Sequence, residues 1–579
     1  MSNSNQYKLS KSYQDALIIL TGIFWIAITY IIWGFYIEDH TGLPINIQSG
    51  LLTEGIIIEN FYIYCQIFTS YIFAFLFKMN RSLPWVGGTF VWLMFLSYCI
   101  ISASILFFLK NCRKDFNSPR SIFIVSSVVY VFLFLDSFVF FSGVRVSYIA
   151  TSAILFGIIF LDRDTKSIRI TFLNLILLTS FFFAFNIRPE SGLGAVFFIL
   201  SFILLSGLFK SKFIYSLILP AMIIVSSIIY LVIESEKIPF LKNTEPYLYY
   251  ISDATFNPNF YTNASKTDSI KYLALEKYFF NDAEIITEQF IESMGSMKAD
   301  LSFRKSNNFF HIFRVTADVL TPCINSNISH TILYLFSVFL FISTVGEKRR
   351  ILFFTINQLI VVFILLMLAY FIKMENRIYL SIIIIAIFLN FTYILRIGSL
   401  YVYLKYKRKF RFYLGLSSIL ITIIFAVEFI PKSLKHRENG IDNERVLTKI
   451  SKLCNDKILL LDVTSPIFTF SSPISLVQLP GVKKVLFYDN GQLAFLPKYK
   501  KYLDETCKCN SSKANEFFNF LISNKQNIVF ISNDERLNFI SGYVKIIHNI
   551  DLRYDKRGFI YGNKESLYRR NKISIYTIQ

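Results

Sequence analysis

The stretch ALIILTGIFWIAITYIIWGFYIEDHTG, residues 16–42, decides the fold class of this chain. About twenty apolar residues, enough to cross a bilayer as a helix, run directly into Glu38, Asp39 and His40. Acids at such a boundary either end a helix at the level of the lipid headgroups or serve as a proton acceptor. Both interpretations are open from this stretch alone, but its apolar run already indicates a membrane protein.

The composition of the whole chain supports the same class. Of 579 residues, 54% are hydrophobic and only 17% are charged, and the mean hydropathy is +0.50. A soluble domain could not bury so much apolar surface, so the sequence predicts a polytopic α-helical membrane protein. The 63 Phe against 22 Gly predict that the spans pack through bulky side chains rather than through small residues.

Apolar runs long enough to span a membrane recur along the chain and predict about eleven transmembrane helices. They lie at about 16–35, 84–109, 121–142, 145–161, 168–186, 192–209, 213–233, 329–344, 350–372, 378–397 and 411–430. A twelfth run, about 60–77, is ambiguous and carries Gln66, Thr69 and Ser70. We expect it to lie in the outer interface as a helix with these three residues on its polar side.

Loop charge sets the orientation. If 60–77 does not cross the membrane, the basic loops at 110–120, 163–169, 348–350 and 405–411 all face the cytoplasm, as the positive-inside rule requires. The outer face then carries the first loop 36–83, three short turns, the long insert 236–328 and the tail. We expect the N-terminus to be cytoplasmic, residues 1–430 to form the membrane domain, and the insert to fold as a helical cap.

The tail, residues 431–579, has a different pattern. Short apolar runs such as KILLLD, KVLFYD, NIVFIS and ISIYTI alternate with helical stretches such as SKANEFFNFLISN, which is typical of a small α/β domain. It holds 24 Lys and Arg against 14 Asp and Glu. A soluble extracytoplasmic domain with this excess should lie against anionic headgroups or an anionic glycan. No nucleic-acid motif is present.

The cysteines permit one covalent link outside the membrane. Cys454 could pair with Cys507 or Cys509, because an outer compartment allows disulfides. The CKC motif has no His partner near it, so the sequence predicts no metal site there.

The outer turns each present charge at the level where a lipid headgroup emerges. The cations are Arg145, Arg188, Lys373 and Arg377, and converging cations of this kind suit a lipid-linked phosphate. Each has a structural alternative: Lys373 and Arg377 could simply end helices, Arg145 could pair with Asp136 inside its span, and Arg188 could pair with Glu190. Glu54 and Glu59 compete with Glu38 and Asp39 as the functional acids of the first loop.

The order of these features resembles the GT-C superfamily of membrane glycosyltransferases, which use polyprenyl-phosphate-linked sugars. The likeness covers about residues 10–430: one span, a long outer loop with acids directly after it, an interfacial helix, and the Arg188-Pro189-Glu190 turn. It implies that Asp39 or Glu38 is the catalytic residue and that Arg188, with Lys373 or Arg377, holds the lipid phosphate. The choice between the two acids stays open, because the aspartate–glutamate–tyrosine pattern common in bacterial members is absent.

The resemblance implies a bacterial cytoplasmic-membrane enzyme that moves a sugar from a polyprenyl-phosphate donor to an envelope lipid, glycan or protein. Some members use a divalent cation, but no ligand set for one is evident here. Three other functions stay open: a glycan polymerase or ligase of the O-antigen type, a transporter that uses the intramembrane Asp136, and a non-catalytic envelope assembly protein that binds partners through its basic tail.

Overall fold

The chain is described here from a computed structural model. The structure describes residues 11–37, 67–112, 118–161, 168–205, 213–236, 273–274, 282, 309–371, 375–397, 408–461, 472, 479–487, 497–511, 513–559 and 573–579. These residues divide between two compact units. The first comprises residues 1–35, 87–227 and 307–435, and the second comprises 36–86, 228–306 and 436–579.

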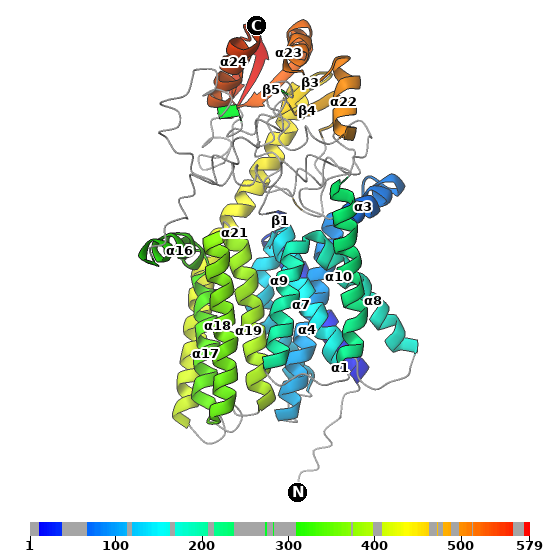
Figure 1. Cartoon of the computed structure of the whole chain (residues 1–579). Coiled ribbons are helices and arrows are strands. Elements are labelled where there is room, and N and C mark those ends of the chain that lie inside the picture. The colour runs from blue at the N-terminus through cyan, green and yellow to red at the C-terminus, as the bar shows by residue number, and fades with distance from the viewer. Residues whose placement is uncertain are drawn as a thin grey trace. The chain divides into compact units, whose positions relative to one another are not determined.

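Each apolar run that predicted a span contains a helix (Figure 1). In chain order these are α1 (Lys11–Ile32), α4 (Trp85–Cys112), α5 (Pro119–Val129), α7 (Gly143–Leu161), α8 (Ile168–Ile187), α9 (Pro189–Leu205), α10 (Phe213–Glu236), α17 (Ile328–Thr344), α18 (Lys348–Phe371), α19 (Asn376–Ile397) and α21 (Arg408–Leu453). Within the described ranges, seven helices are long and apolar enough to cross a membrane, or eight if α16 (Phe309–Asn325) and α17 count as one bent span. A polytopic helical membrane protein is thus supported, and the number eleven stays a prediction.

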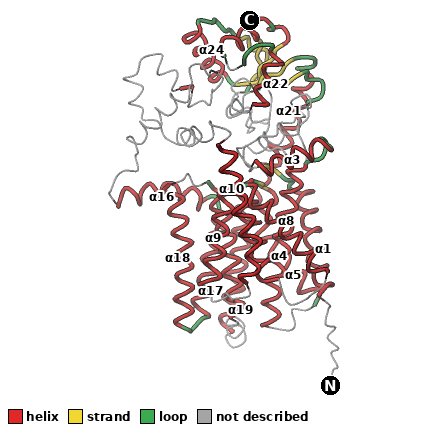
Figure 2. Tube along the Cα trace, turned by 45° about the vertical axis from the view of Figure 1, so that its right-hand side comes forward, coloured by secondary structure: helices red, strands yellow, loops and turns green. Residues whose placement is uncertain are grey.

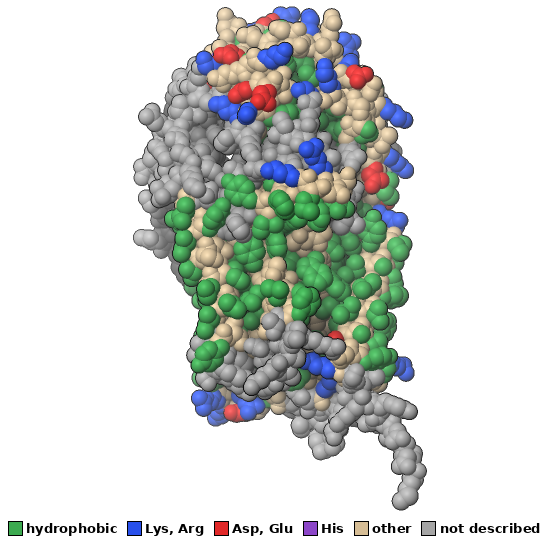
Figure 3. Space-filling view, turned by 90° about the vertical axis from the view of Figure 1, so that its right-hand side faces the viewer, with side chains coloured by type: hydrophobic (Ala, Val, Ile, Leu, Met, Phe, Trp, Pro, Cys, Tyr) green, Lys and Arg blue, Asp and Glu red, His purple; other side chains and the backbone are tan. Residues whose placement is uncertain are grey.

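The helices of the first unit surround α7 and α19. In the most apolar 18-residue stretch of α7, 94% of the residues are buried, and in that of α19 89%. In α18 and α21 the corresponding share is only 17%. The peripheral helices turn large apolar side chains outward, among them Phe172, Phe197, Leu359 and Val427. Hydrophobic side chains cover the flank of the helices (Figure 3). Such a continuous apolar surface is expected where lipid, not water, is the solvent.

Aromatic side chains fill the contacts between helices. Trp25 of α1 stacks on Tyr130 with ring centroids 6.0 Å apart, and the Tyr130 hydroxyl lies 2.8 Å from the Thr29 hydroxyl. Phe341 stacks between Phe354 and Tyr393, and so joins α17, α18 and α19. These contacts confirm the prediction that the spans pack through bulky side chains.

Two helices depart from simple spans. The run 121–142 is not one α-helix: after α5 comes a π-helical turn, η2 (Tyr130–Phe134), then α6 (Leu135–Val139) and the two-residue strand β2 (Phe140–Phe141). The second departure is α16, which is bent by 99° from α17 (Figures 1 and 2). The π-turn inserts an extra residue per turn and so changes which face of the helix Asp136 occupies.

The second unit contains a five-stranded mixed sheet with the strand order β4-β3-β5-β7-β6. The strands β3 (Ile458–Leu461), β4 (Lys484–Phe487) and β5 (Ile528–Ser532) are parallel, and β7 (Ser574–Ile578) and β6 (Tyr554–Phe559) add antiparallel pairs. The four apolar runs that predicted strands are β3, β4, β5 and β7. Every residue of β5 is buried, as expected for a central strand covered on both faces.

Helices pack on this sheet and complete its core. They are the C-terminal part of α21, α22 (Pro497–Cys507), α23 (Ala514–Ser523) and α24 (Asp534–His548). Leu273 and Ala274 of the long insert belong to the same core, and Asp282 accepts hydrogen bonds from Tyr543 and His548 at 2.8 and 2.5 Å. The insert and the tail therefore share one hydrophobic core.

Two local expectations need correction. Cys454, Cys507 and Cys509 are free thiols, so the structure contains no disulfide between them. Helix α3 (Ile67–Met79) is present where an interfacial helix was predicted, but Thr69 and Ser70 are buried rather than exposed on a polar face. Gln66 lies outside the described residues, and the depth of α3 in a membrane stays a prediction. The second unit also contains the two-residue strand β1 (Tyr36–Ile37).

The core of the second unit predicts the effect of one truncation. Phe518→Ala in α23 should reduce the stability of this unit by about 3–5 kcal/mol, because the ring is fully buried. Alkylation of Cys454 measures the loss: burial raises the pKa of this thiol to about 11, so it stays unreactive below pH 9 until the unit unfolds. Leu453→Ala, at a side chain 49% exposed, is the control. Equal labelling of Cys454 in the two variants would contradict the prediction that the buried Phe518 ring stabilises this unit.

Candidate functional site

A buried ion pair stands at one end of the helical unit. Asp136 of α6 is 6% exposed, and its Oδ1 accepts a 2.8 Å hydrogen bond from Nη1 of Arg145, which is 1% exposed. The same Nη1 donates to the Phe140 carbonyl at 2.8 Å. The guanidinium therefore fixes the turn between α6 and α7 as well as neutralising the carboxylate. The sequence had left this pair open as the alternative for Arg145, and the structure confirms it.

Lys432 of α21 is the second cation of this group. Its Nζ lies 3.4 Å from the other oxygen of Asp136 and 4.3 Å from the centre of the Phe140 ring. Two cations therefore share one carboxylate, and the attraction to each stabilises its ionised form. Lys432 is the more accessible of the two, because its side chain is 28% exposed while that of Arg145 is 1% exposed.

Two further polar residues complete this group, which we call the Asp136 cluster (Asp136, Arg145, Lys432, His330 and Glu428). His330 is 3% exposed and hydrogen-bonds to the backbone of Phe132. Glu428 accepts a 2.7 Å hydrogen bond from the backbone N–H of Ser329, at the first turn of α17. The cluster thus connects α5–α7 with α17 and α21, which are far apart in the sequence.

The Arg188 turn is built by its own sequence, RPESG. Pro189 is the first residue of α9, where a missing backbone N–H costs nothing. A side chain at Gly192 would place its Cβ 2.7 Å from the Phe185 ring, so glycine permits the close approach of α8 and α9. Arg188 itself is 20% exposed and lies 3.7 Å from Glu190, and its carbonyl accepts a 3.0 Å bond from Ser147 of α7.

The first turn of α19 carries the third predicted cation. Arg377 forms an ion pair with Glu375, and its side chain is 19% exposed. The Thr331 hydroxyl of α17 lies 2.9 Å from the Tyr379 hydroxyl of α19. This contact ties the Arg377 turn to the helix that carries His330.

These hydrogen bonds bring the predicted cations to one end of the helical unit. Ser147 links the Arg188 turn to α7, Thr331 links the Arg377 turn to α17, and Lys432 and Glu428 link α21 to both. The opposite end holds Arg349 and Arg350 at the start of α18, and Lys110, which bonds to Gln14 near the start of α1. Among the described residues, cations therefore lie at both ends of the unit.

Several predicted site residues lie outside the described residues: Glu38, Asp39, Glu54, Glu59 and Lys373. Their roles stay predictions. Phe35, the last residue before this segment in the first unit, packs on Phe138 and Phe141 at centroid distances of 6.3 and 5.6 Å. The chain therefore enters the acidic loop from a position beside the Asp136 cluster.

Sequence reasoning missed Lys432, His330 and Glu428. A signal was available, because an ionisable residue inside or directly after an apolar run is expensive in a membrane and needs a partner. His330 and Glu428 lie within two predicted spans, and Lys432 follows Pro431 directly after the span that holds Glu428. What the sequence could not show is that Lys432 pairs with Asp136.

Metal binding is not visible in this part of the chain. Among the described residues, no three His, Cys, Asp or Glu side chains come close enough to hold a metal ion. The acids that a cation would use in the resembled family, Glu38 and Asp39, are outside the described ranges.

No protein-family model matches this chain, and no curated protein shows significant sequence similarity to it. The likeness to the GT-C superfamily therefore rests on the order of spans, loops and charged turns. Function has to be argued from the site itself.

The ion pair predicts the effect of removing its acid. Asp136→Asn should destabilise the helical unit by about 3–5 kcal/mol, because it leaves Arg145 and Lys432 near a neutral amide in an apolar setting. Thermal unfolding in detergent should show a fall of several degrees. Glu190→Gln removes the same charge from a side chain that is 80% exposed and should change little. Identical melting of the two variants would refute the structural role of the pair.

Proposed function

We propose that this protein is a membrane glycosyltransferase that moves a sugar from a polyprenyl-phosphate donor to an envelope acceptor on the non-cytoplasmic face. The observation that supports it best is the gathering of Arg188, Arg377 and Lys432 at one end of the helical unit. Glu38 and Asp39 supply the acids of the proposal from the first predicted outer loop. A phosphate on a lipid needs cations, and the activation of a hydroxyl needs an acid.

The cations would serve the leaving group. As the bond to the anomeric carbon breaks, negative charge grows on the lipid phosphate, and fixed guanidinium or ammonium donors stabilise it. Arg188, Arg377 and Lys432 have side chains 20%, 19% and 28% exposed, so each is held by the protein yet reaches the surface. Arg145 is enclosed, and we assign it the positioning of Asp136 and of the Phe140 turn instead.

The acid would serve the acceptor. Asp39 or Glu38 would take the proton of the attacking hydroxyl, a step worth about 10²- to 10⁴-fold in rate. A divalent cation, if bound, would reduce the electrostatic repulsion between the lipid phosphate and this acid.

The orientation rests on the basic loops. The end with Lys110, Arg349 and Arg350 carries the basic loops and should face the cytoplasm. The donor site and the tail would then be extracytoplasmic, in the cytoplasmic membrane of a bacterium. The excess of ten positive charges in the tail would hold it near anionic headgroups or glycan.

One observation favours a second function. Asp136, His330 and Glu428 are ionisable groups enclosed by apolar helices, which is typical of ion-coupled transporters. Transport predicts that a proton gradient drives solute movement through the protein in sealed vesicles. Sugar transfer predicts loss of the polyprenyl-phosphate donor without a gradient, so the same vesicles distinguish the two.

The catalytic assignment is tested by substitution of the acids. In vesicles that contain the purified protein and a labelled polyprenyl-phosphate sugar, Asp39→Asn or Glu38→Gln should reduce transfer to an envelope extract by at least about 100-fold. Expression and insertion should not change. Glu505→Gln, at an exposed carboxylate in the second unit, is the matched control. Full transfer by both single variants and by the double variant would exclude the mechanism.

The donor site is tested separately at Arg188. Arg188→Ala should lower kcat/KM for the donor by about ten- to a hundredfold, the effect of losing one charge-assisted hydrogen bond. Arg188→Lys should recover part of this loss, because the charge returns without the bidentate geometry. Unchanged donor kinetics in the alanine variant would show that Arg188 does not bind the donor phosphate and has only a structural role in its turn.

A further inference from the structure

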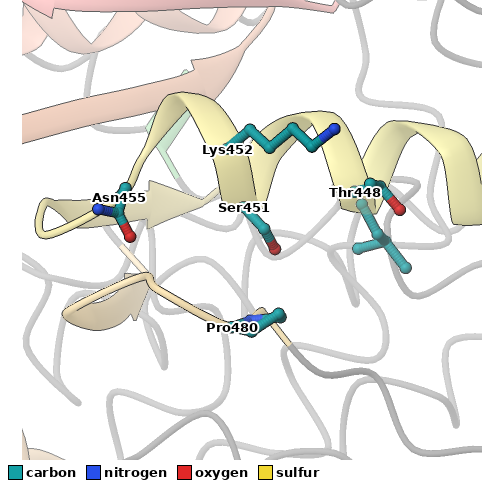
Figure 4. Close-up of a pocket in the computed structure, with 6 residues that line it drawn as sticks. Thr448, Ser451, Lys452, Asn455 and Pro480 are labelled. Atoms are coloured by element: carbon teal, nitrogen blue, oxygen red, sulfur yellow. The ribbon is translucent and has the colours of Figure 1, made fainter.

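The second unit contains a hollow that the proposed transfer site does not use. It has a volume of about 640 Å³ and lies beside the C-terminal end of α21 (Figure 4). Its lining in the described part of the chain comprises Leu447, Thr448, Ser451, Lys452, Asn455 and Pro480. Four of these six side chains are polar, and one of the four is cationic.

The wall opposite the helix is fixed by backbone contacts. Gly481 has φ +82°, and a Cβ there would lie 2.3 Å from Oδ1 of Asn455, so only glycine allows the turn this close. The backbone N–H of Asp456 donates to the Gly481 carbonyl at 2.7 Å, and that of Lys483 donates to the Lys457 carbonyl at 3.0 Å. Pro480 is thereby held in place below the end of α21.

Ser451 is the residue that indicates a ligand. Its side chain is 8% exposed, and its Oγ has no hydrogen-bond partner among the described residues. Figure 4 shows this oxygen on the side of the helix that faces Pro480. A buried hydroxyl without a partner is costly, so a ligand hydroxyl in the hollow would satisfy it.

The lining chemistry selects the class of ligand. Hydroxyl and amide groups of Thr448, Ser451 and Asn455 match the hydroxyls of a sugar, and Leu447 and Pro480 offer an apolar surface to its C–H face. Lys452 adds one positive charge, and the tail as a whole has ten more basic than acidic residues. We propose that this hollow binds a saccharide that carries a carboxylate or phosphate group.

This inference deepens the proposed function, because an acidic glycan bound here would be the acceptor of the transferred sugar. Only the role of the glycan as acceptor rests on the proposed function, because binding of a saccharide is measured in an experiment that requires no sugar transfer. Loss of transfer with intact binding would remove the glycosyltransferase proposal alone. Intact transfer without any binding would remove only the saccharide site.

The test is binding of the purified full chain in detergent to an array of immobilised neutral and acidic saccharides. The chain should bind acidic members, and Ser451→Ala should weaken this binding about two- to tenfold through loss of one hydrogen bond. Lys452→Gln should abolish the preference for acidic over neutral members. Lys525→Gln, at an exposed lysine away from the hollow, should bind as the original chain does.

Two results would overturn the site. One is that no saccharide on the array binds the chain above background. The other is that Ser451→Ala and Lys452→Gln both bind with unchanged strength and selectivity while they remain folded, as measured by protection of Cys454 from alkylation.

Discussion

The structure of the helical unit depends on one carboxylate held between two cations. Asp136 accepts from Arg145 at 2.8 Å and lies 3.4 Å from Lys432, inside helices that are otherwise apolar. A buried charge without a partner is costly among apolar helices, so Asp136 and Arg145 need each other. A π-helical turn precedes α6 and changes the face of the helix on which Asp136 lies. The π-helical turn and the ion pairs of Asp136 with Arg145 and Lys432 thus occur together at one place in the unit.

That arrangement organises one end of the unit for polar chemistry. Lys432, Arg188 and Arg377 present partly exposed cations at this end, each close to an acid, while hydroxyl contacts tie α7 to the Arg188 turn and α17 to α19. Arginine and lysine are the side chains that bind a phosphate headgroup. The second unit adds a separate sheet-based core that includes residues of the long insert, and a polar hollow of its own. A donor site and an acceptor site on different parts of one chain would suit a transferase.

Much of the fold could be predicted because its signals are local. Apolar length placed every helix of the bundle, and short alternating runs placed β3, β4, β5 and β7. Contacts between distant segments were harder. Arg145 and Asp136 are nine residues apart and could be paired from sequence, whereas Lys432 is almost 300 residues from Asp136 and no local pattern joins them. The sequence permitted a disulfide of Cys454 but could not decide it, because spacing shows that cysteines exist, not that their sulfur atoms meet. Glu38 and Asp39, chosen for their place after the first span, lie outside the described ranges.

The central claim is that the end of the helical unit with Arg188, Arg377 and Lys432 binds a lipid-linked phosphate. A cryo-electron microscopy map of the full chain in nanodiscs that contain a non-hydrolysable polyprenyl-phosphate sugar tests it directly. The account predicts phosphate density within hydrogen-bond distance of at least one of these three cations, with residue 39 or 38 facing the sugar. Phosphate density at the opposite end, beside Arg349 and Arg350, would contradict it.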